Sequence, residues 1–462
     1  MIKKLYPLTA AQKMHYDWIR KYKTQQVSGV SVVASLKAEL DFGLLKKCIQ
    51  LEFERYGCMR IRFTKPDEKG EIKQYIVPGE TRDIPIEDLS GMSMAEADNL
   101  MQQWAYETFD GDDIPMCDII MVKLPEGYNG FFVHMDHRLI DSCGLVIMIN
   151  DLMQLYTHYR FNSEYPEDMA DFEEVLEKDL KKASNEKRFA KDKKFWDDQL
   201  DALGEPLYSD IQGPSVLMEA RKRHGDEKLR AADIELNNIF VEVKDYYLEP
   251  EPTRNLIDFC MNHQLSMTNL LLLGIRTYLS KVNNGQEDIT IENFISRRST
   301  HDEWTSGGSR TIMFPCRTVI QPETEFLAAA YEIQNIQNKI YMHSNYDPSL
   351  IMEEMRKRYN TPENTTYESC YLTYQPMPVK MDNPHLINVS QHSKWFANGA
   401  ATKKMYLTVS HTENGGMNFS FHYQTASLNE HDMELLYYYL MRILFKGIAE
   451  PDMSIGEIMR QV

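Results

Sequence analysis

The spacing of hydrophobic positions changes repeatedly along the chain between the period of a strand and the period of a helix. In the first 160 residues, strand patterns occur at 30–36, 59–63, 72–77, 116–123 and 130–136, and helical patterns occur at 41–55, 94–109 and 145–159. Thr9 and Gln12 form a capping box, which predicts an earlier helix containing Tyr16 and Trp18. This order of elements is typical of an α/β unit.

The second half of the chain has the same alternation of strand and helix patterns, but it is not a sequence repeat of the first half. Strand patterns occur at 239–243, 288–294, 311–320, 367–374, 405–410 and 417–423, and helical patterns at 252–263, 266–281, 325–343 and 430–446. Charged residues dominate from 163 to about 213, which predicts surface helices that join two halves, and Pro206 and Gly213-Pro214 mark the end of this segment. We therefore expect two similar α/β halves.

Composition narrows the class of protein. The chain has 462 residues, of which 43% are hydrophobic, so it has enough apolar material for two cores. Its 69 acidic and 51 basic residues give a net charge of -18, which argues against a nucleic-acid partner. No apolar run approaches the ~20 residues of a membrane span, so neither a membrane nor an export signal is predicted. Seven scattered cysteines without a Cys-x-x-Cys pair indicate neither disulfides nor zinc and fit the cytoplasm.

The most informative segment is 131–144, where an apolar strand runs into a polar turn and then into a helix. His137 and Asp141 lie four residues apart in this turn. A histidine at the end of a strand projects into a cleft, and its ordinary pKa of about 6.5 suits proton transfer near neutral pH. An aspartate at the start of a helix caps backbone amides or pairs with an arginine. Without further context, a structural role for a single buried histidine remains the alternative.

Two other kinds of chemistry are considered for this segment and not favoured. His134, Asp136 and His137 contain metal-ligating groups, but imidazoles three residues apart on a strand point to opposite faces and no fourth ligand is evident, so no metal is predicted. Cys143 is either a nucleophile or a small apolar residue under the helix, and the second interpretation is favoured.

Six segments, in order along the chain, together resemble the condensation domains of nonribosomal peptide synthetases. The heptapeptide DHRLIDS at 136–142 is similar to the family motif His-His-x-x-x-Asp-Gly. The other five segments are YPLTAAQ (6–12), the helix and strand at 40–63 that end in MRIRF, KFWDDQL (194–200), GSRTIMFPCR (308–317) and HSNYDP (343–348). The resemblance covers nearly the whole chain.

The resemblance implies an α/β fold made of α+β two-layer sandwiches. It implies two chloramphenicol-acetyltransferase-like subdomains arranged in a V around a central tunnel. The first, at 1–175, would carry the His-x-x-x-Asp motif, crossover helices would follow at 176–213, and the second subdomain would occupy 214–462. The sequence departs from the family pattern at three positions, because Asp136 replaces the first His, Ser142 replaces Gly and Ile312 stands where many members have Asn.

The resemblance also implies roles for residues. His137 would be the general base, and the oxyanion would lie near the backbone N–H groups of Ser142 and Cys143 at a helix N-terminus. Asp141 would pair with Arg60, with Arg62 as the rival partner. Asp136 would either raise the pKa of His137 or be a carboxylate paired with solvent or an arginine. Substrates would contact Asp136, Cys143, Gly144, Gly308 and Ile312.

The function implied is a free-standing condensation-type acyltransferase. It would join an acyl or aminoacyl thioester to an amine or alcohol acceptor, with no bound cofactor and the phosphopantetheine arm of a carrier protein as the acyl donor. Because the first motif begins at residue 6 and the chain ends soon after the last helix, the carrier is expected to act in trans, received by the basic residues at 178–194 or 356–358. The alternatives are an acyl-CoA-dependent acyltransferase and a non-catalytic recruiting module.

Overall fold

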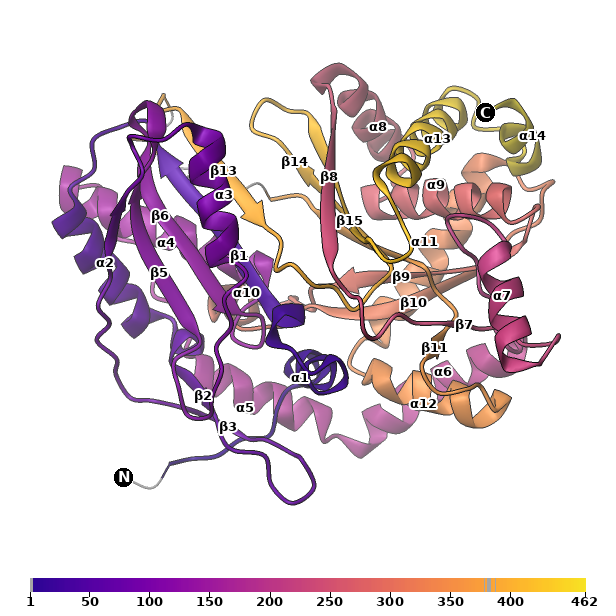
Figure 1. Cartoon of the computed structure of the whole chain (residues 1–462), viewed down its shortest axis with the longest axis horizontal. Coiled ribbons are helices and arrows are strands. Elements are labelled where there is room, and N and C mark those ends of the chain that lie inside the picture. Colours follow the sequence, from indigo (N-terminus) through magenta and orange to yellow (C-terminus); the bar gives the residue numbers. More distant parts are fainter. Residues whose placement is uncertain (1–2, 378, 380–383, 387) are drawn as a thin grey trace. The chain divides into compact units, whose positions relative to one another are not determined.

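The computed structural model describes residues 3–377, 379, 384–386 and 388–462. Contacts between residues divide the chain into two compact units (Figure 1). Unit 1 contains 1–182, 296–312 and 377–400, and unit 2 contains 183–295, 313–376 and 401–462. Two segments that the sequence analysis placed in the second half thus belong to unit 1, because their contacts are with distant parts of the chain.

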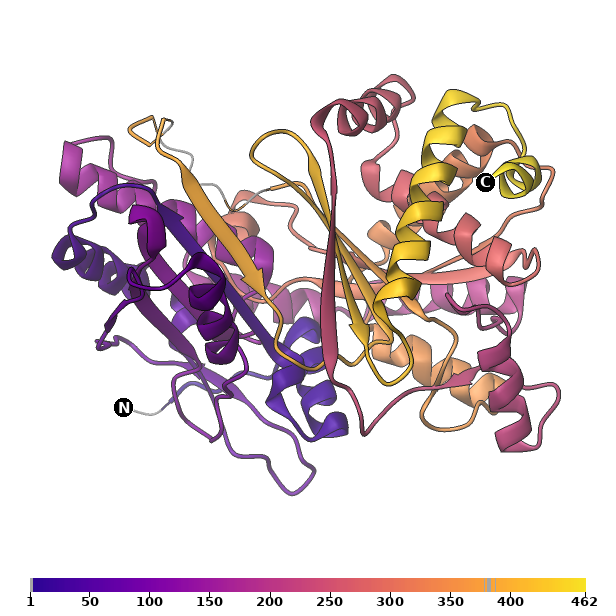
Figure 2. The ribbon, with the colours of Figure 1, turned by 45° about the horizontal axis from the view of Figure 1, so that its top comes forward.

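Unit 1 is built on a five-stranded sheet of order β13-β1-β6-β5-β4. Its strands are β1 (Gly29–Leu36), β4 (Ile86–Asp88), β5 (Cys117–Lys123), β6 (Asn129–Asp136) and β13 (Gln391–Phe396). Neighbouring strands are antiparallel except for β4 and β5. β13 lies beside β1 in both ribbon views and pairs Ser31 with Phe396 (Figures 1 and 2). This pairing over more than 350 residues brings 391–396 into unit 1.

Helices cover both faces of the unit 1 sheet. α2 (Phe42–Arg55) and α4 (Ser142–Phe161) pack on the face formed by Phe131, Val133 and Met135, while α3 (Met94–Trp104) packs on the face formed by Phe132 and Val33. The alternation of side chains along β6 therefore supplies two separate cores. The remaining elements are α1 (Ala10–Tyr22), α5 (Phe172–Ala183), α10 (His301–Thr305), the hairpin of β2 (Ile61–Phe63) and β3 (Gln74–Ile76), and the 3-10 helices Gln25–Ser28, Gly57–Arg60 and Pro125–Gly127.

Unit 2 contains a six-stranded sheet of order β10-β9-β12-β14-β15-β8. Its strands are β8 (Val241–Leu248), β9 (Asp288–Ile295), β10 (Ile312–Val319), β12 (Cys370–Gln375), β14 (Met405–His411) and β15 (Met417–Gln424), and a short pair is formed by β7 (Ala232–Asp233) and β11 (Thr365–Thr366). Its helices are α6 (Glu186–Leu203), α7 (Ser215–His224), α8 (Pro250–Asn262), α9 (Met267–Val282), α11 (Phe326–Met342), α12 (Pro348–Tyr359), α13 (Glu430–Ala449) and α14 (Ile455–Gln461). α9 contacts both α11 and α13.

Most predicted elements are present with shifted ends. The capping box of Thr9 and Gln12 starts α1, as predicted. The strand predicted at 59–63 is shorter, because 57–60 form a 3-10 helix, and α3 ends at Trp104 instead of 109. β4, β7, β11 and β13 were not predicted, because they are short or lie at sheet edges where only one side is paired. Among the helices that the structure describes, none is long and apolar enough to cross a membrane.

Candidate active site

The connection between β6 and α4 places the two candidate residues at defined points. β6 ends at Asp136, His137 follows in a turn, and α4 begins at Ser142 with Asp141 as its N-cap. The strand pairs with β1 and β5 on its two sides, so its end is held firmly. The backbone N–H of His137 donates to the carbonyl oxygen of Ser28 at 2.6 Å, which extends this pairing by one residue. The predicted transition from strand to turn to helix is therefore confirmed.

His137 has the properties of a neutral base. Its side chain is partly exposed, while its Nδ1 atom is buried and has no hydrogen-bond partner among the described residues. Burial lowers the pKa of His137, and the negative charge of Asp141 only partly opposes this. The imidazole is therefore unprotonated near neutral pH and able to accept a proton.

Asp141 is buried and accepts hydrogen bonds from four residues. Arg298 donates from both terminal nitrogens at 2.8 and 2.7 Å, and Gly144 donates its backbone N–H at 2.9 Å. Arg310 donates its backbone N–H, and Thr311 donates both its backbone N–H and its hydroxyl, at 2.8 to 2.9 Å. The charge of Arg298 and these donors hold the pKa of Asp141 well below its usual range despite burial. Asp141 therefore has no oxygen left for a substrate.

The prediction that Asp141 pairs with Arg60 is wrong, and so is the alternative of Arg62. Arg60 donates to the backbone oxygen of Val77, and Arg62 pairs with Glu80 at 2.6 Å. Arg60 precedes β2 and is committed to the backbone next to β3, which keeps its guanidinium away from Asp141. The arginine that binds Asp141 lies 157 positions further along the chain. The hint of it in the sequence is the pair Arg297-Arg298, which begins three positions after the strand pattern at 288–294.

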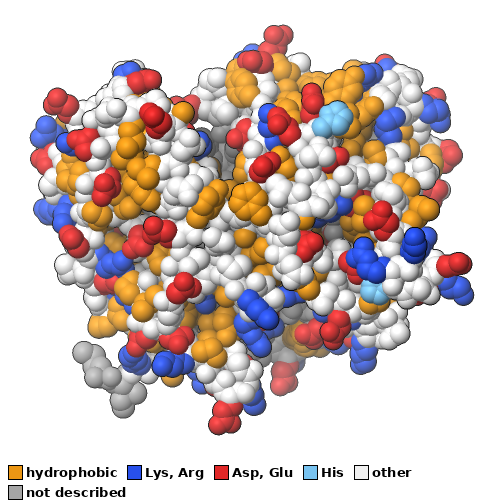
Figure 3. Space-filling model, in the orientation of Figure 1, with side chains coloured by type: hydrophobic (Ala, Val, Ile, Leu, Met, Phe, Trp, Pro, Cys, Tyr) orange, Lys and Arg blue, Asp and Glu red, His pale blue; other side chains and the backbone are white. Residues whose placement is uncertain are grey.

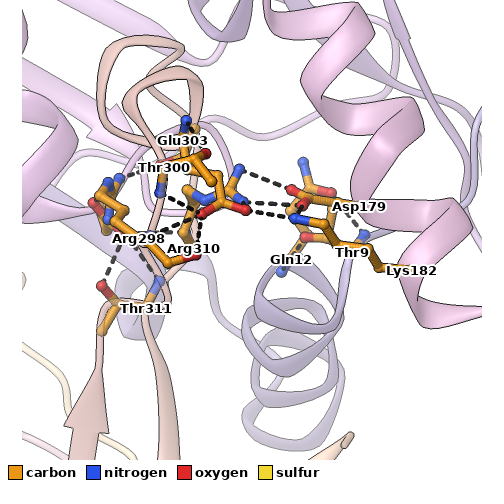
Figure 4. Close-up of polar contacts among 12 residues, drawn as sticks. Thr9, Gln12, Asp179, Lys182, Arg298, Thr300, Glu303, Arg310 and Thr311 are labelled. Carbon is orange, nitrogen blue, oxygen red and sulfur yellow. Dashed lines mark hydrogen bonds and ion pairs between the residues drawn. The ribbon is translucent and has the colours of Figure 1, made fainter. Parts of the chain in front are cut away.

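Within unit 1, charged side chains join the segment that carries Arg298 to α5. Arg310 pairs with Asp179 of α5 at 2.8 Å, and Glu303 of α10 pairs with Lys182 at 2.6 Å. Figure 4 shows Arg298, Arg310 and Glu303 together with these two α5 residues. Segment 298–311 is thus held from both sides, by Asp141 at the start of α4 and by α5.

Asp136 is paired with an arginine, which was one of its two predicted states. Arg138 donates to the Asp136 carboxylate from its backbone N–H, Nε and one terminal nitrogen at 2.8 to 2.9 Å. The guanidinium also lies 4.4 Å from the centre of the Phe63 ring. Both oxygens of Asp136 are occupied, so the geometry does not support the prediction that this residue contacts substrate.

The first turn of α4 accommodates Ser142, which replaces the glycine of the family pattern. Ser142 has helical backbone geometry as the first residue of α4, so this position does not need the conformational freedom of glycine. Cys143 is partly exposed, and burial raises the pKa of its thiol to about 11, which keeps it protonated and unreactive near neutral pH. A Cβ atom on Gly144 would lie 2.9 Å from Ile140 and 3.2 Å from Arg298, so this glycine permits the approach of the arginine.

Gly308 and Ile312 were predicted to contact substrate, and the structure places both in packed surroundings. Gly308 has a φ of 86°, its carbonyl oxygen accepts from Arg298 at 3.2 Å, and a Cβ atom there would lie 2.7 Å from the Phe172 ring. Ile312 is fully buried at the start of β10. Gly308 therefore helps to position Arg298, and neither residue offers a free surface.

A second histidine, which the sequence did not predict to be part of the site, lies beside His137. His15 of α1 is buried, and its ring is stacked on the His137 ring with 4.3 Å between centroids and 18° between planes. Gln12, one turn earlier on the same helix face, donates to the backbone oxygen of Arg138 at 3.2 Å. The signal in the sequence was the spacing of Gln12, His15 and Trp18, which places three polar or aromatic side chains on one face of a helix.

The histidine on the strand itself has a structural role. His134 contacts the Ser31 hydroxyl at 2.8 Å through Nδ1 and the Glu107 carbonyl at 3.1 Å through Nε2. Both of its nitrogens are occupied, and its ring stacks on Phe109. In the part of the chain that the structure describes, no group of three or more ligating side chains is arranged to hold a metal ion.

A family model described as condensation domain matches residues 2–460. The chain therefore belongs to the condensation-domain family, whose members form amide bonds by acyl transfer in nonribosomal peptide synthesis. Surfactin synthase subunit 1 of Bacillus subtilis (strain 168) is 22% identical over 464 residues, which cover 98% of this chain and 12% of that protein. The chain thus spans only about an eighth of this relative's length.

Solved structures agree with this assignment at the level of the fold. The first condensation domain of the calcium-dependent antibiotic synthetase, solved with a substrate analogue, has a TM-score of 0.79 at 16% identity, with 98% of each chain covered. The starter condensation domain of rhizomide synthetase, solved with C8-CoA, has a TM-score of 0.79 at 15% identity and covers 98% of this chain and 97% of that one. The predicted mixed helix and sheet fold is confirmed.

Proposed function

We propose that this protein is a condensation-type acyltransferase in which His137 is the general base. The single observation that carries the proposal is a neutral, partly exposed imidazole at the end of β6, next to a helix start that is held by the buried pair of Asp141 and Arg298. A module that only recruits partners has no need of an unprotonated histidine on so rigid a support.

The proposed reaction transfers an acyl group from a thioester to an amine or, less often, an alcohol. The acceptor nitrogen attacks the thioester carbonyl carbon while Nε2 of His137 accepts a proton from it. The negative oxygen of the tetrahedral intermediate lies near the first backbone amides of α4, those of Ser142 and Cys143, where the helix dipole favours an anion. The carbon–sulfur bond then breaks, and His137 returns the proton to the departing thiolate.

Asp141 supports this chemistry without taking part in it. Its carboxylate is fully engaged with Arg298, Gly144, Arg310 and Thr311, so it fixes the loop between His137 and α4. Its negative charge also raises the proton affinity of His137 against the effect of burial. We therefore assign it a positioning role.

The donor that we propose is a thioester on the phosphopantetheine arm of a carrier protein, acting in trans, with acyl-CoA as the alternative.

The basic run at 178–194 offers less positive charge to a carrier than its composition suggests. Lys178 pairs with Asp302, Lys182 with Glu303, Lys193 with Asp197 and Lys194 with Asp198, at 2.6 to 2.9 Å. On the face that Figure 3 shows, basic and acidic side chains are intermixed. Charge attraction at this run is therefore weak, and a carrier must be recognised mainly through its arm and acyl group.

The test compares the wild-type protein with His137→Ala. Each is incubated with octanoyl-CoA or with an octanoyl-loaded carrier protein and an amine, and product is measured by intact-mass spectrometry. Loss of a general base lowers the rate by about 10²–10⁴-fold. His301→Ala, which removes an exposed histidine of the same unit, is the matched control and keeps the wild-type rate. Melting temperatures of all three proteins are expected to agree.

The outcomes separate the candidate functions. A His137→Ala protein that keeps more than half of the wild-type rate contradicts the assignment of the base. Equal turnover of octanoyl-CoA and octanoyl-carrier contradicts the preference for a carrier. Binding of carrier without any turnover by the wild-type protein would favour the recruiting module instead.

A further inference from the structure

The ring of His137 packs against a second imidazole that the proposed reaction does not use. His15 is 4% exposed, and its ring is nearly parallel to that of His137 at a centroid distance of 4.3 Å. Trp18, one turn further along α1, meets the His15 ring edge-on at 4.9 Å and 77°. Three rings are thus in contact one after another, from α1 to the end of β6.

α1 is fixed to the same turn that carries His137, so the stacking of the His15 and His137 rings is held by the fold. The amide of Gln12 donates to the Arg138 carbonyl at 3.2 Å and contacts the Gln74 amide at 2.7 Å. The capping box of Thr9 and Gln12 fixes the start of the helix. His15 lies one turn beyond Gln12 on the same face, so its ring is presented to His137 by a rigid element.

The two imidazoles differ in their ability to take a proton. Burial lowers the pKa of His15 well below its ordinary value. The charge of His137 when it is protonated and the charge of Arg138 lower this pKa further, while Asp141 opposes them. The negative charge of Asp136 also raises the pKa of His137, and this carboxylate is already paired with Arg138. When His137 accepts a proton, His15 therefore stays neutral. A neutral aromatic face stabilises a cation placed over it.

We propose that His15 is a positioning residue of the condensation reaction, whose neutral ring fixes the plane of His137 and stabilises the imidazolium that forms when His137 accepts a proton. This inference rests on the proposed function of His137. The ring geometry itself is independent of that function, which allows the two to be tested separately.

The decisive measurement is an NMR titration of protein labelled with ¹⁵N-histidine, which needs no substrate. The His137 signals are assigned by their loss in His137→Ala. His15→Phe keeps a flat ring, and His15→Leu keeps apolar volume without one. We expect His15→Leu to bind a proton at His137 about tenfold more weakly than wild type, and His15→Phe to stay within about twofold. If His15→Leu does not fold, as judged by its melting temperature, His15→Met serves as the non-aromatic variant.

A second readout is the rate of aminolysis of octanoyl-CoA by the N-acetylcysteamine thioester of leucine. We expect kcat/KM to fall about tenfold in His15→Leu and less than threefold in His15→Phe. Equal proton affinities of His137 in the wild type and both variants overturn the proposal, and so do equal rate losses in the two variants. Retained activity in His137→Ala overturns the proposed function but leaves the titration result as it stands.

Discussion

The connection between β6 and α4 carries two buried aspartates, and the two are neutralised in opposite ways. Asp136 pairs with Arg138, two residues away, and among the described residues this arginine alone donates hydrogen bonds to its carboxylate. Asp141 pairs with Arg298, 157 residues away, and accepts from three residues of segment 298–311. The first pair closes a turn, whereas the second joins distant parts of unit 1.

The two pairs therefore have different structural roles, although their aspartates are close in the sequence. The local pair sets the conformation of the turn in which His137 sits, because Arg138 folds back on the residue that ends β6. The distant pair decides where the start of α4 lies, because it attaches that start to a segment held in turn by α5. A base and its support are thus built from one local and one long-range interaction.

The largest expected effect comes from removing the distant pair. Asp141→Ala leaves Arg298 charged, buried and without its carboxylate, which costs about 3–5 kcal/mol. The measurement is native-state hydrogen exchange of peptides from β6, α4 and segment 298–311, which gives the free energy of opening for each. Exchange is expected to rise in all three regions together. A loss below about 1 kcal/mol, or one confined to α4, would contradict the joining role.

A double-mutant cycle sharpens the comparison by asking which arginine is coupled to Asp141. Arg298→Ala combined with Asp141→Ala is expected to give a coupling energy of about 2–3 kcal/mol, because the two side chains are in direct contact. Arg60→Ala is the matched control, since the guanidinium of this arginine donates to the Val77 carbonyl and has no hydrogen bond to Asp141 in the described structure. Its coupling to Asp141 is expected to stay within ~0.5 kcal/mol. Comparable coupling for both arginines would refute the assignment of Arg298.

Loss of the local pair of Asp136 and Arg138 is expected to lower the free energy of opening less, and to affect a smaller region. Asp136→Ala leaves Arg138 without its carboxylate but still over the Phe63 ring, so we expect a loss of about 2 kcal/mol in the opening energy of β6. Exchange in segment 298–311 is expected to stay at the wild-type rate, since Asp136 has no contact with it in the described structure. Faster exchange there would show that the two pairs are not separate.

The smallest effect concerns pH. His15 and His137 both have a pKa below the ordinary value, mainly because of burial, so the unfolded chain binds protons more readily than the folded protein as pH falls below about 6.5. The contribution of these two histidines to the free energy of unfolding is therefore fully present above that pH and is lost as the pH falls below it. The contribution of His15 to this loss is expected to grow as the pH falls from 7 to 5.5. His15→Phe is expected to remove this part, as measured by hydrogen exchange of α1 and β6 at both pH values; an unchanged slope would contradict it.

Local pattern predicted much of the fold and part of the site. The capping box of α1, the apolar run of β6 and the polar turn before α4 are short-range features, so the position of His137 and the N-cap role of Asp141 follow from them. The partner of Asp141 could not be predicted in this way, because Arg60, Arg62 and Arg298 are the same residue type and no local pattern distinguishes them. Which one reaches the carboxylate depends on how the chain returns to unit 1.

The sequence by itself thus determined most of the elements and the histidine at the strand end, because each depends on residues within about one element of one another. It also determined the family, because each of the six motifs is a short local pattern and their order along the chain is read directly from the sequence. Only the tertiary structure decided that β13 completes the unit 1 sheet, that Arg298 binds Asp141 and that His15 stacks on His137. These contacts join segments tens to hundreds of residues apart. Their pairing is selected by packing and by the need to neutralise buried charge, which a pattern along the chain does not express.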